Sequence, residues 1–326
     1  MAIDITHYLD TIASEKHPKQ HAMWVDAWDY GNQLLNKSSL NKDSLNKGQS
    51  LPWHDIAAIV AHIKQLQNLV NSDIVTVEVG DFYTSWLRSH PTLLNAMGEK
   101  RRLGYALRTM LAELGAREQL KDIINALCET YRDKPVVLAI PSPKQWIASA
   151  YCAAKNIDGV DVEALNIDWN DAESASMYVA DFLRSFSECA ISGLLIRDDA
   201  DQGPASDAEV ARYQPVLNVG EHYRWQCILD GCPQSYVPTP NTGISFSLRE
   251  TQRSQPSQKA QQAPPLFTAL KLSAQDWAQH PSSIEPGGAC CYVCIPSDGI
   301  PETVLEKLTL LRTVRETREV INDDTC

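Results

Sequence analysis

The sequence predicts an α/β protein built as a single (β/α)8 barrel, a TIM barrel, with residues 1–326 as one domain. Apolar residues alternate along the chain between short runs with the period of a strand and stripes with the period of a helix. The 326 residues suffice for one barrel of roughly 250 residues with insertions. Hydrophobic residues make up 44% of the chain and charged residues 21%, a composition typical of a globular protein with a large core.

The clearest strands are short and apolar enough to be buried on both faces, as parallel strands are. They are Ile74–Val79, Pro135–Ile140, Ala190–Ile196, Gly243–Leu248 and Ala289–Ile295. Three weaker segments bring the total to eight: His21–Val25, a stretch near Val216–Val219, and Leu266–Leu270.

Helical stripes lie between the strands, at Trp53–Leu69, Leu103–Tyr131, Ser142–Ala154, Asp171–Glu188 and Pro301–Val314. The start of the third helix is marked by its sequence. Ser142 suits the N-cap position, Pro143 suits the first helical position, and Gln145 stands three residues after the cap, where a glutamine can complete a capping box. Two polar stretches, 36–49 and 249–265, interrupt the alternation, and we expect exposed loop insertions there. They are either plain surface loops or mobile loops beside the site.

The formal net charge is −12, and no basic run is longer than Lys100–Arg102, so we expect no nucleic-acid partner. The sequence has neither an N-terminal export signal nor an apolar run of membrane-spanning length, so we expect a cytoplasmic protein with no membrane partner. The nine cysteines are scattered and odd in number, which favours reduced thiols. Nucleotide-phosphate, serine-hydrolase and zinc-protease motifs are all absent from the sequence.

Acidic residues follow several expected strands, where barrel enzymes gather catalytic groups. They are Asp26, Glu78, Asp81, Asp198 and Asp298. Carboxylates that converge in an apolar mouth repel one another, which raises the pKa of at least one toward a useful acid or base value. The competing interpretation is that these residues cap and form turns.

Other candidate residues carry different chemistry. Arg197 follows a strand and suits a substrate carboxylate, although Asp199 is an alternative partner. Tyr151 is either a proton donor or a packed helix residue. If it ends a strand, His222 is a general base, a metal ligand or a substrate-binding residue, and if it is helical it is an interfacial residue. Trp24 and Trp28 line an aromatic pocket or pack in the core.

Four segments together resemble the barrel superfamily of uroporphyrinogen decarboxylase, cobalamin-independent methionine synthase and the corrinoid-dependent methyltransferases. They are Trp53–Asp81, Lys134–Tyr151, Asp181–Asp199 and Gly287–Leu311. The resemblance implies acids at the ends of the strands in the first and third of these segments, a tyrosine at the position of Tyr151, and a dimer. Their order and spacing carry the resemblance, because no single one of these motifs is specific.

The chain also departs from these families. Where the porphyrin decarboxylases have arginines, the first strand reads Met23–Tyr30 with Asp26 and Asp29, and Asp298 replaces a histidine after the last strand. Uroporphyrinogen is therefore not the expected substrate. The methyltransferases hold zinc by a His-x-Cys pair and a later cysteine, and this sequence has no His-x-Cys. If zinc binds, Cys290 and Cys294 are the candidate ligands, since Cys291 points to the other side of the strand.

Three functions stay open at this stage. The first is a cofactor-independent lyase of decarboxylase type acting on a small carboxylated molecule. Arg197 would be its carboxylate anchor, Glu78 or Asp81 its general acid, Asp198 an orienting or charge-stabilising group and Tyr151 a donor. The second is a zinc- and cysteine-dependent methyltransferase with a corrinoid or folate partner. The third is a barrel that has lost catalysis and serves as a binding subunit.

Overall fold

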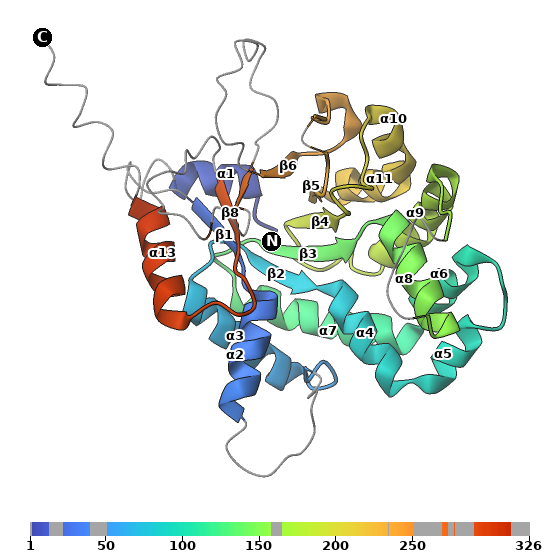
Figure 1. The fold of residues 1–326 in the computed structure, drawn as a ribbon, viewed down its shortest axis with the longest axis horizontal. Helices are drawn as coiled ribbons and strands as arrows, with labels where there is room; N and C mark the ends of the chain where they lie inside the picture. The colour runs from blue at the N-terminus through green and yellow to red at the C-terminus, as the bar shows by residue number, and fades with distance from the viewer. Residues whose placement is uncertain are drawn as a thin grey trace, which may run out of the picture.

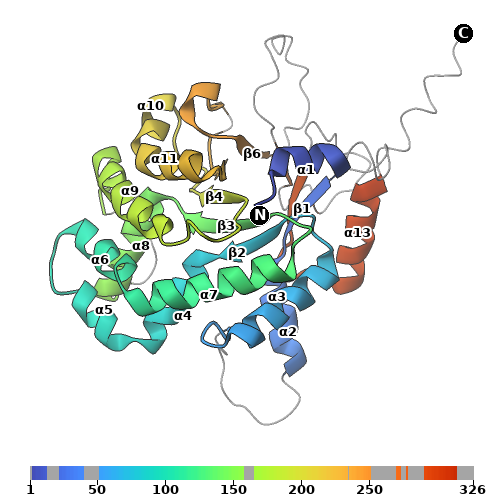
Figure 2. The same cartoon turned by 180° about the vertical axis from the view of Figure 1, so that it is seen from behind.

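The computed structural model describes residues 2–12, 22–39, 51–157, 165–233, 235–250, 269–272, 277 and 290–313. Within them, eight strands form one sheet in the order β1-β8-β7-β6-β5-β4-β3-β2. Every pair of neighbours in that order is parallel. Helices flank the strands in both views (Figures 1 and 2). The chain is an α/β protein with a parallel sheet.

The strands are short, with four to six residues each. Their bounds are β1 Ala22–Asp26, β2 Val75–Glu78, β3 Val136–Pro141, β4 Gly193–Arg197, β5 Gln226–Asp230, β6 Phe246–Glu250, β7 Ala269–Leu272 and β8 Cys290–Cys294.

The helices fill the connections between the strands. Those of the first half are α1 Ile5–Thr11, α2 Trp28–Ser39, α3 Ile56–Val70, α4 Val79–Ser89, α5 Pro91–Met97, α6 Leu103–Leu111 and α7 Leu114–Thr130. Those of the second half are α8 Pro143–Lys155, α9 Trp169–Arg184, α10 Asp207–Val210, α11 Gln214–Tyr223 and α13 Pro301–Thr313, with 3-10 turns η2 Ala211–Tyr213 and η3 Pro240–Thr242.

Local chemistry explains several helix boundaries. The Ser142 hydroxyl accepts from the backbone N–H of Gln145 at 3.1 Å and Pro143 opens α8, which confirms the predicted start. Asp55 caps α3 in the same way, and α3 ends at Asn71 in the left-handed conformation (φ 49°).

Successive strand residues face opposite sides of the sheet and enter two separate apolar cores. The inner core lies between the strands and includes Trp24, Ala139, Leu195, Ile228 and Tyr292. The larger outer core joins the other strand residues to the surrounding helices. A polar residue on an inner position near a strand end is therefore directed to the side of the sheet on which the inner core lies.

Helix α1 covers the amino ends of the strands. Its Ile5 and Leu9 are buried in the inner core. The backbone N–H of Ile5 donates to Gln226 Oε1 at 2.8 Å, and that of Ile3 donates to Ser192 Oγ at 3.2 Å, both at the beginning of strands. Helix α1 thus packs against the amino end of the inner core.

The two outer members of the strand order, β1 and β2, are joined by bonds from the residues that precede β2. Asp73 N–H donates to the Met23 carbonyl, and Met23 N–H donates to Asp73 Oδ2, each at 2.8 Å. Val25 N–H donates to Ser72 Oγ at 2.9 Å, and Trp24 Nε1 donates to Thr76 Oγ1 at 2.8 Å.

The structure corrects the weakest strand prediction. Val216–Val219 is part of helix α11, in which Pro215 stands in the first turn and Val216, Leu217 and Val219 face the core. The strand is β5, Gln226–Asp230, directly after this helix. The spacing of the apolar residues in 216–219 suits both a strand and a helix. Only the preceding Pro215, which favours the first turn of a helix, distinguishes the two structures.

The predicted long helix Leu103–Tyr131 is two helices. Helix α6 ends at Leu111, and the carboxylate of Glu113 caps α7 by accepting from the N–H of Ala116 at 2.5 Å. The insertions predicted at 36–49 and 249–265 lie mostly outside the described residues, and their described parts belong to α2 and β6. Residues 266–268 of the predicted seventh strand also lie outside, whereas Ala269 and Leu270 are in β7.

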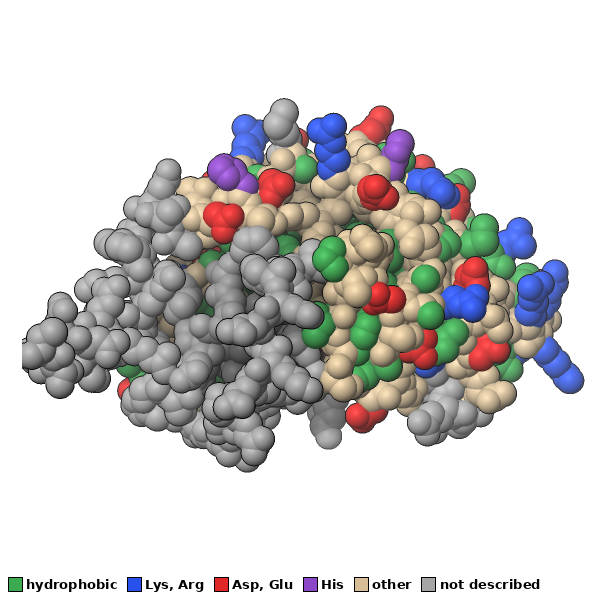
Figure 3. Space-filling view, turned by 90° about the horizontal axis from the view of Figure 1, so that it is seen from above, with side chains coloured by type: hydrophobic (Ala, Val, Ile, Leu, Met, Phe, Trp, Pro, Cys, Tyr) green, Lys and Arg blue, Asp and Glu red, His purple; other side chains and the backbone are tan. Residues whose placement is uncertain are grey.

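Among the described residues, no helix combines the length and apolar character that crossing a bilayer requires. Acidic, basic and apolar side chains are interspersed over the described surface seen in Figure 3.

Candidate active site

Charged and polar side chains occupy inner positions at the carboxyl ends of the strands. We call them the mouth cluster, and they are Asp26, Glu78, Arg197, Asp230 and Tyr292. The first four are the last residues of β1, β2, β4 and β5. Asp26, Arg197, Asp230 and Tyr292 each lie two residues after a residue of the inner core on the same strand, and Glu78 pairs in register with Ala139 of that core on β3. Because side chains alternate along a strand, all five face the inner core.

Arg197 is the centre of the mouth cluster. Its Nη1 lies 3.0 Å from Asp26 Oδ2, and its Nη2 lies 2.7 Å from Glu78 Oε1. The carboxylate side chains are only 12% exposed and that of Arg197 is 31% exposed, so water screens these pairs only partly. Burial alone would lower the pKa of Arg197, but electrostatic interactions with Glu78, Tyr292, Asp26 and Asp230 outweigh it and raise that pKa. Arg197 is therefore a permanent cation.

Tyr292 binds the carboxylate of Asp26 from the side of the inner core. This fully buried side chain donates its hydroxyl to Asp26 Oδ2 at 2.8 Å, and its ring meets Trp24 edge-on at 5.2 Å. Burial is the main cause that raises the pKa of Tyr292, so the hydroxyl keeps its proton and acts as a donor. Asp26 Oδ2 thus accepts from two groups at once.

Glu78 is a buried carboxyl group with a raised pKa. Burial raises the pKa of Glu78 to about 8, and the carboxylates of Asp26, Asp81 and Asp29 add to this effect. Arg197 acts in the opposite direction but does not offset burial. Glu78 therefore exchanges a proton in the range where a general acid or base is most effective.

Two further acids stand at the rim of the mouth cluster. The Trp28 indole N–H donates to Asp81 Oδ2, and Asp81 is exposed. Burial, followed by the charges of Asp26 and Asp81, raises the pKa of Asp29. Four carboxyl groups other than Asp230 therefore share this region with one guanidinium, and the mouth favours neutral or positively charged molecules over anions.

Asp198 was predicted to join this group but lies on the other side of β4 from Arg197. Its Oδ2 accepts from the Tyr213 hydroxyl at 2.5 Å, and its Oδ1 accepts from the N–H of Asp199 at 3.0 Å. Burial raises the pKa of Asp198 to about 6 despite these bonds. The strand ends at Arg197, so the pleat that turns Arg197 inward turns Asp198 outward.

Tyr151 and His222 are also away from the mouth cluster. Tyr151 stands in the last two turns of α8, where Lys155 Nζ lies 6.0 Å from its ring centre. His222 is an exposed residue in the last turn of α11, which leads into the amino end of β5, and its ring contacts Tyr223. His222 is helical, which is the second of the two alternatives that the sequence left open, and no strand ends at it.

Trp24 and Asp298 have contrasting environments. Trp24 is buried in the inner core one layer below the mouth, where it contacts Tyr292 and so supports the cluster from within. Asp298 is an exposed residue of the loop between β8 and α13. The structure thus brings together Asp26, Glu78 and Arg197, with Asp81 at the rim, out of the residues that the sequence indicated.

Sequence analysis missed Asp230 and Tyr292. Asp230 was missed because β5 was not recognised, and without that strand the residue had no strand end to mark. Tyr292 was hidden among the cysteines of β8, although its position between Cys290 and Cys294 on one face of the strand was already known from the period of two. An acidic residue after Cys227–Leu229, a run of apolar residues, was the signal available for Asp230.

The cysteines of β8 do not fit one zinc ion. Cys290 and Cys294 share a face but lie four residues apart, about 13 Å along a strand, whereas two ligands of one ion lie within about 4 Å of each other. Cys290 is buried and its pKa is raised by that burial, which disfavours a thiolate, while Cys294 is exposed. The described residues contain no group of three histidines, cysteines or acids placed to hold a metal.

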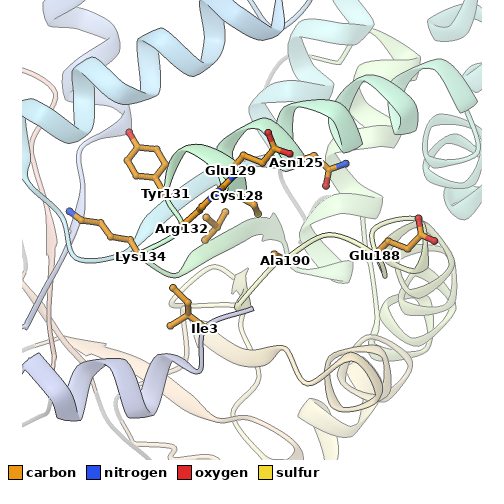
Figure 4. Close-up of a pocket in the computed structure, with 10 residues that line it drawn as sticks. Ile3, Asn125, Cys128, Glu129, Tyr131, Arg132, Lys134, Glu188 and Ala190 are labelled. Atoms are coloured by element: carbon orange, nitrogen blue, oxygen red, sulfur yellow. The ribbon is translucent and has the colours of Figure 1, made fainter. Parts of the chain in front are cut away.

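A cavity of about 520 Å³ lies at the opposite end of the sheet (Figure 4). Its walls come from Ile3, from the end of α7, and from residues at the amino ends of β3 and β4 such as Lys134 and Ala190. Two of its charged groups are already engaged, since Lys134 Nζ binds the Ser72 carbonyl at 2.7 Å and Glu188 pairs with Lys121 at 3.0 Å. The candidate chemistry is thus at the mouth and not in this cavity.

No protein-family model matches the chain, and no curated protein matches it. Among solved structures, it is similar to a methyltransferase from Methanosarcina mazei, with a TM-score of 0.54 and 12% sequence identity. The alignment covers 95% of this chain and 97% of that one. At this identity the likeness concerns the fold, and it extends over nearly the whole of both chains.

Proposed function

We propose that the strands close into a (β/α)8 barrel of the uroporphyrinogen decarboxylase and methionine synthase superfamily, and that the chain is an enzyme that transfers a methyl group between small molecules. The bonds between β1 and residues 72–76 support closure. The observation that carries the function is Glu78, a buried carboxyl group at the mouth whose proton exchanges near neutral pH. It belongs to a fold similar to that of a methyltransferase.

Glu78 would serve as the proton acceptor and donor of the reaction. When a methyl group moves from a leaving group to an acceptor, the bond to the leaving group breaks, the bond to the acceptor forms, and the acceptor's N–H or S–H proton must depart. Ionised Glu78 takes that proton, and neutral Glu78 supplies one to the leaving group. At pH 7 a carboxyl group of pKa about 8 is about 10% ionised, so both forms are available.

Arg197 would orient Glu78 and bind substrate. Two of its nitrogens are held by Asp26 and Glu78. The Nε–H is buried and finds no acceptor among the described residues, and a buried donor without a partner costs about 1–3 kcal/mol.

A decarboxylase has less support. That hypothesis assigned Arg197 to a substrate carboxylate, but the carboxyl groups of Asp26 and Glu78 already occupy two of its guanidinium nitrogens. A further carboxylate would also meet the charges of Asp26 and Asp230. We assign no step to zinc, because the thiols of β8 do not fit one ion. A homodimer stays a prediction from the resemblance.

The test is a methyl-transfer assay with the purified full chain. A methyl corrinoid, a methyl folate and a methylsulfonium compound, each with a deuterated methyl group, are offered with small thiol and amine acceptors, and products are detected by mass spectrometry. We expect a methylated acceptor from the wild type and a loss of at least about 100-fold in Glu78→Gln, the usual scale of general acid–base catalysis.

Glu173→Gln is the matched control for this assay, because Glu173 is half exposed and pairs with Arg212 on the surface. It should keep wild-type activity. Equal activity of Glu78→Gln and the wild type would contradict the role of Glu78, and no product with any pair would favour the non-catalytic barrel.

A further inference from the structure

The mouth cluster contains a continuous chain of polar contacts that begins outside the reach of a substrate. The Tyr292 hydroxyl donates to Asp26 Oδ2 at 2.8 Å, the same oxygen lies 3.0 Å from Arg197 Nη1, and Arg197 Nη2 lies 2.7 Å from Glu78 Oε1. Tyr292 is 1% exposed, so it contacts no molecule in the mouth. Its influence on Glu78 passes through two other side chains.

We propose that Tyr292 is a positioning residue whose hydroxyl divides the guanidinium of Arg197 between Asp26 and Glu78. This inference rests on the proposed role of Glu78 and adds a residue to it. The physical basis is that Asp26 Oδ2 has two donors. Because the hydroxyl of Tyr292 donates one hydrogen bond to Asp26 Oδ2, the attraction of this carboxylate for Arg197 is partly satisfied. Arg197 Nη2 is then free to bind Glu78.

The ring of Tyr292 cannot easily turn away from Asp26. It packs edge-on against Trp24, whose indole N–H is itself bound to Thr76 Oγ1 at 2.8 Å, on the neighbouring β2. Asp26 is fixed as well, since its backbone carbonyl accepts from the N–H of Ile295 at 2.8 Å. The hydroxyl and the carboxylate are thus held by two different strands in the same relative position.

The groups that act electrostatically on Glu78 and Arg197 come from all the surrounding described elements. They are Asp26 from β1, Asp29 from α2, Asp81 from α4, Arg197 from β4, Asp230 from β5 and Tyr292 from β8. In this set only Arg197 favours the ionised form of Glu78. Any change that draws the guanidinium toward Asp26 must therefore favour the neutral form of Glu78.

The experiment is an infrared pH titration that follows the carbonyl stretch of protonated Glu78, assigned as the band that disappears in Glu78→Gln. In Tyr292→Phe, Asp26 Oδ2 keeps only Arg197 as a donor and draws it away from Glu78. We expect the apparent pKa of Glu78 to rise by about one unit, a tenfold change in proton affinity. An unchanged or lower pKa overturns the proposal.

Tyr83→Phe is the matched control. Tyr83 is as deeply buried as Tyr292, but its hydroxyl has no hydrogen-bond partner among the described residues, and its ring packs against Trp146 and Phe182. The same loss of a hydroxyl there should leave the Glu78 band where it is in the wild type. A shift of equal size in both variants would mean that general loosening of the core moves the band, which also overturns the proposal.

Asp26→Asn keeps the inference testable if Tyr292→Phe does not fold. This variant removes the competing carboxylate and releases Arg197 to Glu78, so the apparent pKa of Glu78 should fall, and adding Tyr292→Phe to it should cause no further change. A rise in the single variant, or a further rise in the double variant, contradicts the division of Arg197. The titration requires no turnover, so these results stand apart from the methyl-transfer assay.

Discussion

Replacing Glu78 by glutamine should remove a pH dependence of stability that the wild type carries. The pKa of Glu78 is raised from 4.5 to about 8 by folding, so the native state binds more protons than the unfolded state between these values. Such a group stabilises the fold below its unfolded pKa, and that contribution is lost as pH rises through the folded pKa. Between pH 5.5 and 8.5 the linkage relation gives a loss of about 3 kcal/mol.

The assay is urea unfolding followed by tryptophan fluorescence at these two pH values. Glutamine keeps the shape of Glu78 and an oxygen for Arg197 Nη2 but cannot ionise. The decrease in the free energy of unfolding between pH 5.5 and 8.5 should therefore be smaller in Glu78→Gln than in the wild type by about 3 kcal/mol. Comparing the two proteins cancels other titrating groups, among them Asp198, whose pKa is raised to about 6.

Glu173→Gln provides the control, because this half-exposed surface pair should contribute less than about 1 kcal/mol at either pH. The reasoning is refuted if Glu78→Gln loses as much stability as the wild type between the two pH values. That result would mean that Glu78 is ionised in the folded protein at neutral pH.

Two further predictions concern the scaffold that holds the mouth. Ile5→Ala in α1, which packs against the amino end of the inner core, should lower the free energy of unfolding by about 2–5 kcal/mol. Leu114→Ala, at a residue that is 69% exposed, should change it by less than about 0.5 kcal/mol. Equal effects of the two substitutions in urea unfolding would contradict the packing of α1. Gly231 and Gly243 have similar φ values of 86° and 83°, but a Cβ at Gly231 would lie 2.1 Å from the Asp198 carbonyl oxygen, and one at Gly243 would lie 3.5 Å from its nearest neighbour, Leu217 Cβ. In Gly243→Ala, backbone strain alone should destabilise the fold by about 1–3 kcal/mol. Gly231→Ala adds a steric clash to the same strain, so its melting temperature should be clearly lower than that of Gly243→Ala. Similar melting temperatures of the two variants would show that the segments around Gly231 and Asp198 separate at little cost.

The sequence predicted the strands whose apolar residues are buried on both faces, because that burial leaves a continuous apolar run. It failed at β5 because Val216–Leu217 and Val219 fit both periods, and the true strand, Gln226–Asp230, begins and ends with polar residues. Those polar residues are there for tertiary reasons. Gln226 Oε1 accepts from the start of α1, and Asp230 faces Arg197.

The site was predictable where a strand end could be located. Asp26, Glu78 and Arg197 end recognisable strands, and the period of two turns them inward. Asp198 was misplaced by a single residue of register, since the strand ends at Arg197 and the next side chain points outward to Tyr213. The pairing of Arg197 with two carboxylates depends on strands far apart in sequence and could not be read from local patterns, so its assignment to a substrate carboxylate was premature.

The pH dependence of methyl transfer tests the central claim most directly, namely that Glu78 at the mouth moves the proton of the reaction. With the donor and acceptor pair found for the wild type, kcat/KM should follow the ionisation of one group with an apparent pKa near 8, and this step should be absent from the residual activity of Glu78→Gln. A profile with the same step in Glu78→Gln as in the wild type would contradict the account.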